Sequence, residues 1–440
     1  MNQLSYKETI KLGLTMFALF FGAGNMIFPP LVGQQAGSNV WITITGFLIT
    51  GVGLPFLGVL AVTLSGNQLQ DLAGKAHPRF GLIFTIIVYL AIGPFFGVPR
   101  TATVSFEMGV APFLPDTIEN ASLAVFTVIF FAVTAWLSLK PNKIVDRFGN
   151  VLTPVLLAIV ALIVVMGIIH PAGAIGQPQV PFDKDPFIGG FIEGYGTMDA
   201  IAALVFAIIV INAIRSKGIE DRPSIIKHTI KSGIIAVTGL SLVYLALAYL
   251  GATSRTVAPD AANGGDILTQ LALALMGTGG QLLLGLAVIL ACLTTSVGLV
   301  SACSAFFAKT IPPLHYKAIV LIICGFTAIV ANIGLTQLIA ITVPVLIGIY
   351  PLAIVLISIS FFHKWFRGYR EVYIFSLAAA GIVGFFDMLK AFGVIIQPVI
   401  QVLEYLPFYE KGVGWIVPAV ILAVCGYFVE VYRNREEHSG

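Results

Sequence analysis

The sequence predicts an all-α integral membrane protein with twelve transmembrane helices. Three observations lead to this fold class. Of the 440 residues, 58% are hydrophobic and only 10% are charged, whereas about a quarter of the residues in a soluble domain are charged. The apolar runs are long and continuous, which fits helices and excludes the alternating strands of an outer-membrane barrel. Finally, the positive charges are divided unequally between the predicted loops.

Each predicted span is an apolar run that reaches the length of about 20 residues that a helix needs to cross a bilayer. The third and eighth runs are longer, so we expect those helices to tilt, bend or extend beyond the lipid. The twelve runs cover residues 9–32, 40–65, 80–110, 121–139, 148–170, 193–214, 230–252, 280–307, 317–335, 338–361, 372–392 and 413–432.

The loop charges predict the orientation. If the N-terminus lies in the cytoplasm, the inner segments hold 19 of the 24 Lys and Arg residues and the outer segments hold four. Positive residues are retained on the cytoplasmic side of a membrane. We therefore expect both termini to be cytoplasmic. The clean division also supports the number of spans, because one miscounted span would scramble it.

The first predicted span is interrupted by residues 22–30, which contain two glycines, an asparagine and two adjacent prolines. Gly weakens a helix, and Pro lacks an N–H and clashes with the preceding turn. Broken backbone at membrane depth is tolerated only where it is buried in protein or lines a cavity. Such a span is typical of a transporter binding site. The alternative is a kinked helix that only packs closely.

The interrupted span offers specific chemistry. A half-helix N-terminus has free N–H groups and a positive dipole, which suit a carboxylate. We expect Ala23, Gly24 and Asn25 to supply those N–H groups. Gly22 and Gly24 let a ligand approach the backbone. The amide oxygen of Asn25 and unwound carbonyl groups are candidate ligands of a cation.

Two charged residues, Arg100 and Glu107, lie inside the third predicted span. Charges in a span usually pair or line a water-filled path. A spacing of seven residues places both on one helix face, about 10 Å apart along the axis. That separation is too large for a close pair unless both side chains reach toward each other. A gate and a structural pair remain equal alternatives.

The sixth predicted span begins with Glu-Gly-Tyr-Gly-Thr-Met-Asp-Ala at residues 193–200, which is again poor helix interior. Asp199 could carry a proton, face an ammonium group or lie in an external vestibule.

The interruption of the sixth span falls five spans after that of the first span. An odd number of spans repeated in tandem must invert its orientation, and inverted repeats with a site at their interface are a recurrent transporter plan. Chance similarity of two Gly-rich segments is the alternative.

The repeat divides the chain into four parts. We expect a first five-helix repeat at 1–170, an external connection at 171–192, a second, inverted repeat at 193–361, and two trailing helices with the C-terminus at 362–440.

The eighth span contains three consecutive hydroxyl residues, Thr294, Thr295 and Ser296. Two of them could join carbonyl groups of the first span around a cation. Bonding to the carbonyl one turn earlier is the alternative.

Four separated motifs resemble those of the branched-chain amino acid:cation symporter family, within the amino acid–polyamine–organocation superfamily. They are Gly22–Pro30 (GAGNMIFPP), Pro99–Glu107 (PRTATVSFE), Glu193–Ala200 (EGYGTMDA) and Leu293–Leu299 (LTTSVGL). The resemblance covers essentially the whole chain. It implies the five-plus-five inverted repeat with discontinuous first and sixth helices.

The resemblance also implies roles for particular residues. Gly22 to Asn25 match the Gly-x-Gly-Asn pattern of sodium-coupled relatives, so Ala23 and Gly24 would bind the substrate carboxylate and Asn25 would lie at an ion. A second cation would lie between carbonyls near Ala18 and Phe21 and a hydroxyl pair. The pair is either Thr294–Thr295 or Thr295–Ser296. The sixth-span residues Tyr195, Gly196 and Thr197 would complete the substrate site, although their sequence departs from that of the sodium relatives.

The implied function is secondary symport of leucine, isoleucine and valine into a bacterial cell across its cytoplasmic membrane, coupled to Na⁺ or H⁺. A permease or exchanger for another small apolar amino acid is the alternative. The sequence lacks the Gly-rich loop with Lys-Ser/Thr that direct use of ATP would require, and no repeated polar residues suggest an ion-channel filter.

An enzyme is not expected, because the six histidines lie in loops or at span ends: His77, His170, His228, His315, His363 and His438. The four cysteines lie in apolar runs and predict neither a disulfide framework nor a metal centre. Apart from the coupling ion we expect no cofactor, and apart from the substrate and the lipid bilayer we expect no nucleic acid or obligate protein partner.

Overall fold

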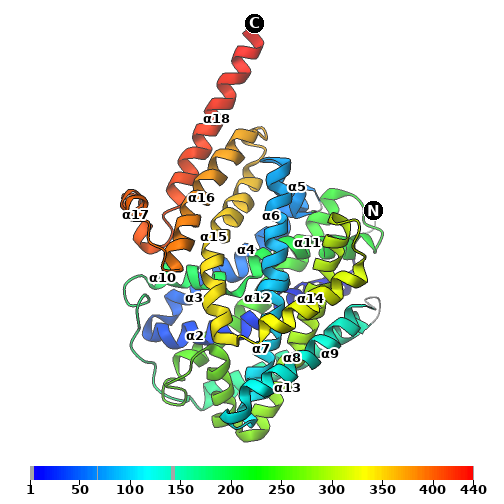
Figure 1. The fold of residues 1–440 in the computed structure, drawn as a ribbon, viewed down its shortest axis with the longest axis vertical. Helices are drawn as coiled ribbons and strands as arrows, with labels where there is room; N and C mark the ends of the chain where they lie inside the picture. Colours follow the sequence, from blue (N-terminus) through cyan, green and yellow to red (C-terminus); the bar gives the residue numbers. More distant parts are fainter. Residues whose placement is uncertain (1–3, 67, 140–143, 440) are drawn as a thin grey trace.

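The computed structural model describes residues 4–66, 68–139 and 144–439, and every regular element in these ranges is helical. By length and composition, eight of the described helices could cross a membrane, or up to nine if one pair bent by 47° counts as a single span. These helices confirm the prediction of an all-α membrane protein. Figure 1 shows the helices gathered into one bundle, from which α18 extends toward the C-terminus.

The α-helices are joined mostly by short connections, and several spans contain 3₁₀ or π turns. Their bounds are α1 Tyr6–Phe20, α2 Ala23–Ala36, α3 Val40–Leu48, α4 Leu54–Ser65, α5 Leu69–Ala73, α6 Pro78–Leu90, α7 Gly97–Gly109, α8 Glu119–Ser138, α9 Ile144–Ile169, α10 Pro186–Glu193, α11 Asp199–Arg215, α12 Arg222–Ala252, α13 Gly264–Thr310, α14 Tyr316–Ala331, α15 Leu335–Phe362, α16 Arg370–Ala391, α17 Gln397–Leu403 and α18 Ile416–Ser439.

The first predicted span is divided between α1 and α2. Helix α1 ends at Phe20, and α2 begins at Ala23. Between them, Phe21 (φ −79°, ψ 94°) and Gly22 (φ −126°, ψ −162°) have extended backbone, so the helical hydrogen-bond ladder stops there. The two prolines that follow lie inside α2 and do not end it.

The sixth predicted span is interrupted as well, within the segment 193–200. Helices α10 and α11 are separated by the 3₁₀ turn Gly194–Thr197 and by Met198, which has a left-handed φ of 65°. Because α10 already begins at Pro186, it occupies residues assigned from sequence to the connection 171–192. Pro at the first helical position is a favourable start. The interruption therefore lies within the helix pair and not at its beginning.

The long third and eighth predicted spans are bent at glycines. Helices α6 and α7 are joined by a π turn, Ala91–Phe95, in which Gly93 has non-helical backbone (φ −88°, ψ −116°). Helix α13 is broken at Gly277, whose φ of 68° lies in the left-handed region that Gly adopts readily. The part of α13 before Gly277 begins at Gly264 and precedes the eighth predicted span, 280–307.

Glycines bring α2 into backbone contact with its neighbours. A Cβ atom on Gly251 of α12 would lie 1.9 Å from the carbonyl oxygen of Pro30, and one on Gly264 of α13 would lie 1.7 Å from that of Ile27. Side chains at these two positions would therefore push the helices apart. Small residues at helix crossings are a general means of close packing in membranes. They hold α2 at the centre of the bundle.

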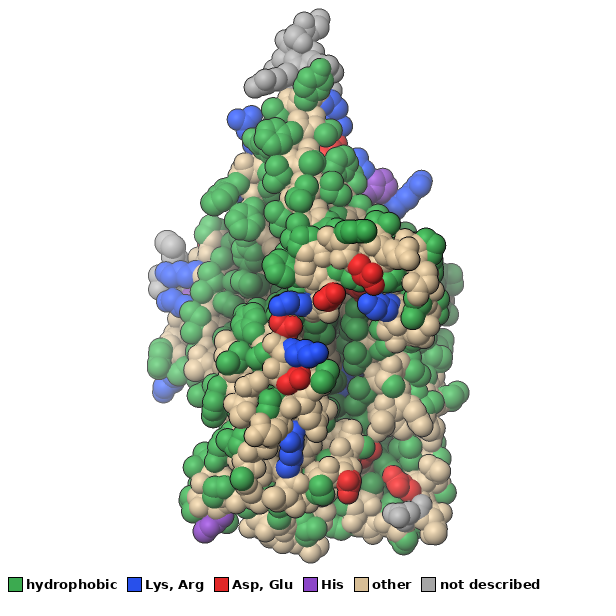
Figure 2. Space-filling model, turned by 90° about the vertical axis from the view of Figure 1, so that its left-hand side faces the viewer, with side chains coloured by type: hydrophobic (Ala, Val, Ile, Leu, Met, Phe, Trp, Pro, Cys, Tyr) green, Lys and Arg blue, Asp and Glu red, His purple; other side chains and the backbone are tan. Residues whose placement is uncertain are grey.

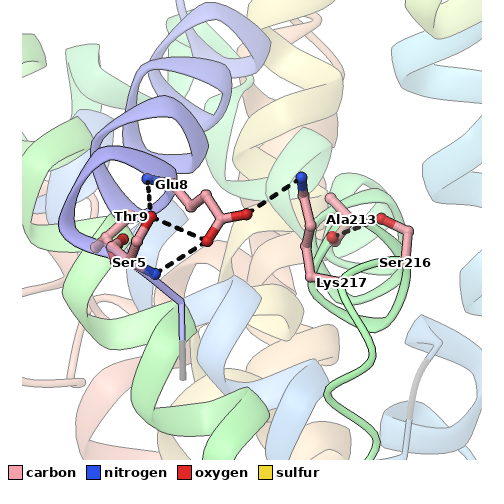
Figure 3. Close-up of polar contacts among 6 residues, drawn as sticks. All are labelled: Ser5, Glu8, Thr9, Ala213, Ser216 and Lys217. Atoms are coloured by element: carbon pink, nitrogen blue, oxygen red, sulfur yellow. Dashed lines mark hydrogen bonds and ion pairs between the residues drawn. The ribbon is translucent and has the colours of Figure 1, made fainter. Parts of the chain in front are cut away.

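An exposed cluster joins the start of α1 to the chain just after α11 (Figure 3). The hydroxyl of Ser5 accepts a hydrogen bond from the Glu8 N–H, and the Glu8 carboxylate accepts one from the Ser5 N–H at 3.0 Å. The latter bond is the main reason why the pKa of Glu8 is lowered. Lys217 Nζ lies 3.4 Å from the same carboxylate. The cluster thus connects two half-helices that border the interruptions.

The outer surface is suited to lipid. Large hydrophobic side chains such as Trp136, Ile168 and Ile329 are more than half exposed, and Figure 2 shows a face on which hydrophobic side chains are abundant and charged ones are confined to a few clusters. The last long helices, α16 and α18, pack against each other, and α16 also packs against α15. Buried residues of α16, among them Tyr373 and Leu377, belong to the same hydrophobic core as the interrupted helices.

Candidate functional site

A small cavity of about 50 Å³ lies where the two interrupted helices meet. It is large enough for more than one water-sized group, since one water requires roughly 10–15 Å³ on this measure. Its polar wall comes from both interruptions, from α7 and from α13, and includes Gly22, Asn25, Arg100, Thr197, Asp199 and Thr295. Its apolar wall includes Ile92, Ala202, Phe206 and Leu299. Eight of the sequence-predicted residues therefore line one cavity: Gly22, Ala23, Gly24, Asn25, Arg100, Thr197, Asp199 and Thr295.

The two interruptions touch directly. A Cβ atom on Gly24 would lie 2.9 Å from the carbonyl oxygen of Thr197, so only glycine allows this approach. Ala23 and Gly24 occupy the first turn of α2, where N–H groups have no acceptor within their own helix. Both residues line the cavity. The positive end of the α2 dipole is thus placed at the wall of the cavity.

Both atoms of the Asn25 amide are hydrogen-bonded. Its Oδ1 accepts a hydrogen bond from the Gly22 N–H at 2.7 Å, which fixes the interrupted backbone. Its Nδ2 donates to Asp199 Oδ2 at 2.6 Å. In this arrangement the oxygen assigned from sequence to a cation is engaged by the first interruption, and the nitrogen links that interruption to the second.

Asp199 is the centre of a buried polar cluster. It begins α11, and only 6% of its surface is exposed. Besides the bond from Asn25, its Oδ2 accepts a hydrogen bond from the Tyr244 hydroxyl at 2.8 Å. The Asn25 Nδ2 also donates to that hydroxyl. Sequence reasoning missed Tyr244, although a tyrosine in the middle of an apolar span is a signal that could have directed attention to it.

Arg100 is almost completely buried, with 2% of its surface exposed. Its Nη1 donates to the carbonyl oxygen of Gly196 at 2.6 Å, and its guanidinium lies over the Phe28 ring, 5.4 Å from the centroid. Its Nε and Nη2 atoms are buried and have no hydrogen-bond partner among the described residues. No ion pair joins Arg100 to Glu107 in that part of the chain, and Glu107 does not line the cavity.

The remaining residues of the sixth-span segment have different surroundings. Thr197 lines the cavity, and its hydroxyl accepts a hydrogen bond from the Asp199 N–H at 3.3 Å. Gly196 supplies the carbonyl that Arg100 uses. Tyr195, assigned from sequence to the substrate, does not line the cavity, because the 3₁₀ turn directs its ring onto Tyr350, with centroids 4.2 Å apart.

The three hydroxyl residues of α13 point in different directions. The hydroxyls of Thr294 and Thr295 both donate to the Ala291 carbonyl, at 2.7 and 3.1 Å. Only Thr295 of the three lines the cavity, and its side chain lies against the first interruption, 3.2 Å from the place where a Gly22 Cβ would be. Ser296 instead meets Thr134 of α8, at 3.4 Å between the hydroxyl oxygens.

The two carbonyl positions expected at the cation, Ala18 and Phe21, do not line the cavity, whereas their neighbours Leu19 and Phe20 do. The ring of Phe21 stacks on Phe17, with centroids 5.2 Å apart. Among the residues that the structure describes, no group of three or more His, Cys, Asp or Glu side chains could hold a metal ion. A cation here would therefore depend on neutral oxygen atoms, the ligands of hard cations, with at most Asp199 as an anionic neighbour.

The chain is similar over nearly its whole length to a known protein family and to curated bacterial proteins. A family model described as "Branched-chain amino acid transport protein" matches residues 5–433. The chain is 48% identical to the branched-chain amino acid permease BraB of Bacillus subtilis over 98% of its own length and 97% of that protein. It is 46% identical to the branched-chain amino acid transport system 2 carrier protein of Pseudomonas aeruginosa, with 96% and 97% coverage.

Two solved structures have a similar fold at low sequence identity. Mhp1, a nucleobase-cation-symport-1 family transporter captured in a closed conformation with bromovinylhydantoin, matches with a TM-score of 0.63 at 14% identity, covering 98% of this chain and 94% of its own. MhsT in complex with L-phenylalanine matches with a TM-score of 0.57 at 14% identity, covering 97% and 98%.

Proposed function

This chain belongs to the branched-chain amino acid transport protein family, and from that premise we propose that it imports leucine, isoleucine and valine by secondary symport. The observation that carries the proposal is the cavity between two interrupted helices, which combines bare helix ends, a buried Arg and a buried Asp with an apolar wall. Alternating access would expose this cavity first to the outside and then to the cytoplasm of a bacterium. In this orientation both termini are cytoplasmic.

We propose twelve transmembrane helices, arranged as two inverted five-helix repeats, at about 9–170 and 193–361, followed by two trailing helices. The interruptions between α1 and α2 and between α10 and α11 support this plan, since they are five predicted spans apart. The similarity in fold to Mhp1 and MhsT is consistent with it. Discontinuous helices at the interface of inverted repeats are a recurrent way to build a transporter site.

The substrate has three recognisable parts, and the cavity offers a wall for each. The N–H groups of Ala23 and Gly24 would receive the carboxylate at the positive end of α2. Asp199 would face the ammonium group. Ile92, Phe206 and Leu299 would surround the branched side chain. An apolar pocket distinguishes side chains that differ by one methylene by only about 1–3 kcal/mol, so the three branched-chain amino acids should compete.

The coupling ion is Na⁺ or H⁺ in this proposal. Na⁺ would be held by neutral oxygens close to Gly22 and by the Thr295 hydroxyl, which lies against that interruption. H⁺ would instead be carried by Asp199, whose carboxylate joins the two interruptions. The two alternatives place the driving ion on different residues of the same cavity.

Leucine uptake into proteoliposomes tests the proposal, with Na⁺ and pH gradients imposed separately. Accumulation driven by one gradient, and competed by isoleucine and valine, is the expected result. Uptake that equilibrates without accumulation under either gradient would exclude symport and favour a permease. Competition by alanine but not by valine would point to an exchanger or permease for other small apolar amino acids.

A further inference from the structure

The guanidinium of Arg100 has one satisfied side and one unsatisfied side. On the satisfied side, Nη1 donates to the Gly196 carbonyl and lies near Gly24. On the other side, Nε and Nη2 are buried without a partner among the described residues. A buried charge is costly unless it is paired and hydrogen-bonded. Such an unsatisfied edge, on a residue that lines a cavity, indicates a missing ligand.

The geometry of the unsatisfied edge identifies the chemical class of that ligand. In arginine, the Nε–H and one Nη2–H bond point the same way and form a planar fork. A carboxylate matches this fork with its two oxygen atoms in a bidentate pair. Within the described residues no carboxylate forms a salt bridge with Arg100. The nearest acid on the cavity wall, Asp199, instead accepts hydrogen bonds from Asn25 and Tyr244.

The cavity as a whole is matched to a zwitterion. It carries one buried cation, Arg100, and one buried acid, Asp199, on a wall that is otherwise neutral and partly apolar. An α-amino acid brings a carboxylate and an ammonium group of opposite charge. With such a ligand bound, each buried group would have a partner, and the site would bury no unpaired charge.

We propose that Arg100 is the carboxylate receptor of the transported amino acid and that its Nε–Nη2 edge grips both carboxylate oxygens, beside the N–H groups of α2. This assignment rests on the proposed function and deepens it. It changes the role expected for Arg100 from a gate or a partner of Glu107 to direct contact with the substrate. Because Arg100 Nη1 also donates to the Gly196 carbonyl, the Arg100 side chain would link the bound carboxylate to the sixth-span interruption.

The test compares three ligands on purified protein in detergent, by competition against radiolabelled leucine. Leucine has both charged groups, leucinamide lacks the carboxylate, and 4-methylpentanoate lacks the ammonium. In the unaltered protein leucinamide should compete at least roughly a hundredfold less well than leucine. A hydrogen bond to a charged group contributes about tenfold to a hundredfold in affinity, and a bidentate pair has two of them.

The variants are Arg100→Gln, Arg100→Lys and the control Ser105→Ala. Arg100→Gln should weaken leucine and 4-methylpentanoate by roughly tenfold to a hundredfold or more while leaving leucinamide unchanged. Arg100→Lys keeps the charge without the fork, so its loss should be intermediate. Ser105 is buried on the same helix, donates to the Thr101 carbonyl at 2.7 Å and does not line the cavity. Its alanine variant should resemble the unaltered protein.

The outcomes separate this inference from the proposed function. If the unaltered protein does not bind leucine, isoleucine or valine, the proposed function fails and this inference fails with it. If it binds them but Arg100→Gln, with an unchanged melting profile, still prefers leucine to leucinamide by the same factor, only this inference is overturned. If Arg100→Gln does not fold, the discrimination measured for Arg100→Lys decides, and an unreduced ratio there overturns it equally.

Discussion

The hydroxyl of Tyr244 provides the sharpest test of the buried cluster. It donates to Asp199 Oδ2 at 2.8 Å, and its residue is fully buried on α12. Tyr244→Phe removes one oxygen atom, keeps the ring in its edge contact with Phe47, and leaves Asp199 with Asn25 as its remaining side-chain donor from the cluster. Tyr350 is a control, because it is also fully buried but, among the described residues, its hydroxyl forms no hydrogen bond with Asn25 or Asp199.

The structure sets the magnitude of the effect. A hydrogen bond to a charged group contributes about 1.5–3 kcal/mol, and one between neutral groups about 0.5–1.5 kcal/mol. Tyr244→Phe should therefore destabilise the protein by about 1.5–3 kcal/mol if Asp199 is ionised, and by less if it is protonated. Since about 1 kcal/mol shifts the Tm of a mid-sized protein by roughly 2–4 °C, and that of a longer chain by less, a decrease of a few degrees is expected.

The assay combines a melting curve in detergent with leucine uptake in proteoliposomes. Tyr244→Phe should lower both the Tm and the uptake rate, because the carboxylate that joins the two interruptions loses a donor. Tyr350→Phe should change neither. If the two variants have the same Tm and the same uptake as the unaltered protein, the cluster does not stabilise the site, and the reasoning from its hydrogen bonds is refuted.

Three further predictions concern the cavity wall. Asn25→Ala should abolish ion-dependent leucine uptake with expression intact, since one amide bonds both interruptions; unchanged uptake with unchanged ion dependence would remove it from the site. Gly24→Ala should impair uptake, because its Cβ would lie 2.9 Å from a carbonyl oxygen, whereas Gly298→Ala, with free space around it, should be neutral in the same assay. If uptake is driven by Na⁺, Thr295→Ala should raise the Na⁺ concentration for half-maximal uptake and Ser296→Ala should not; equal effects of the two on Na⁺-driven uptake would contradict the assignment of the cavity-facing hydroxyl.

The positions of the two helix interruptions could be predicted from the sequence. Gly22 and the glycines of the sixth-span segment are poor helix formers, and their positions in otherwise apolar runs predicted where the ladder would stop. In the structure, the α-helices are interrupted at Phe21–Gly22 and at Gly194–Met198. These features are local, because they follow from the conformational preferences of a few consecutive residues.

Which side chains face the cavity was harder to predict, because this depends on how packing against its neighbours rotates each helix about its axis. Three adjacent hydroxyls on α13 look equivalent in sequence, yet Thr295 faces the cavity and Ser296 faces α8. Tyr195 was expected at the substrate but stacks on Tyr350. Tyr244 was missed, since its partners Asn25 and Asp199 are far away along the chain. Only packing brings such residues together.

The gap between α1 and α2 has a mechanical consequence. A continuous helix could swing one of its halves only by breaking several main-chain bonds, whereas here the ladder of α1 ends with the bond from the Phe21 N–H to the Phe17 carbonyl and α2 begins at Ala23. Helix α1 is therefore joined to α2 only by extended backbone, although it also packs along α12. Its free end is restrained by a solvent-exposed Glu8–Lys217 contact, of a type that contributes little. The backbone at Phe21 and Gly22 therefore sets, before any ligand binds, where these two helices can change their relative orientation.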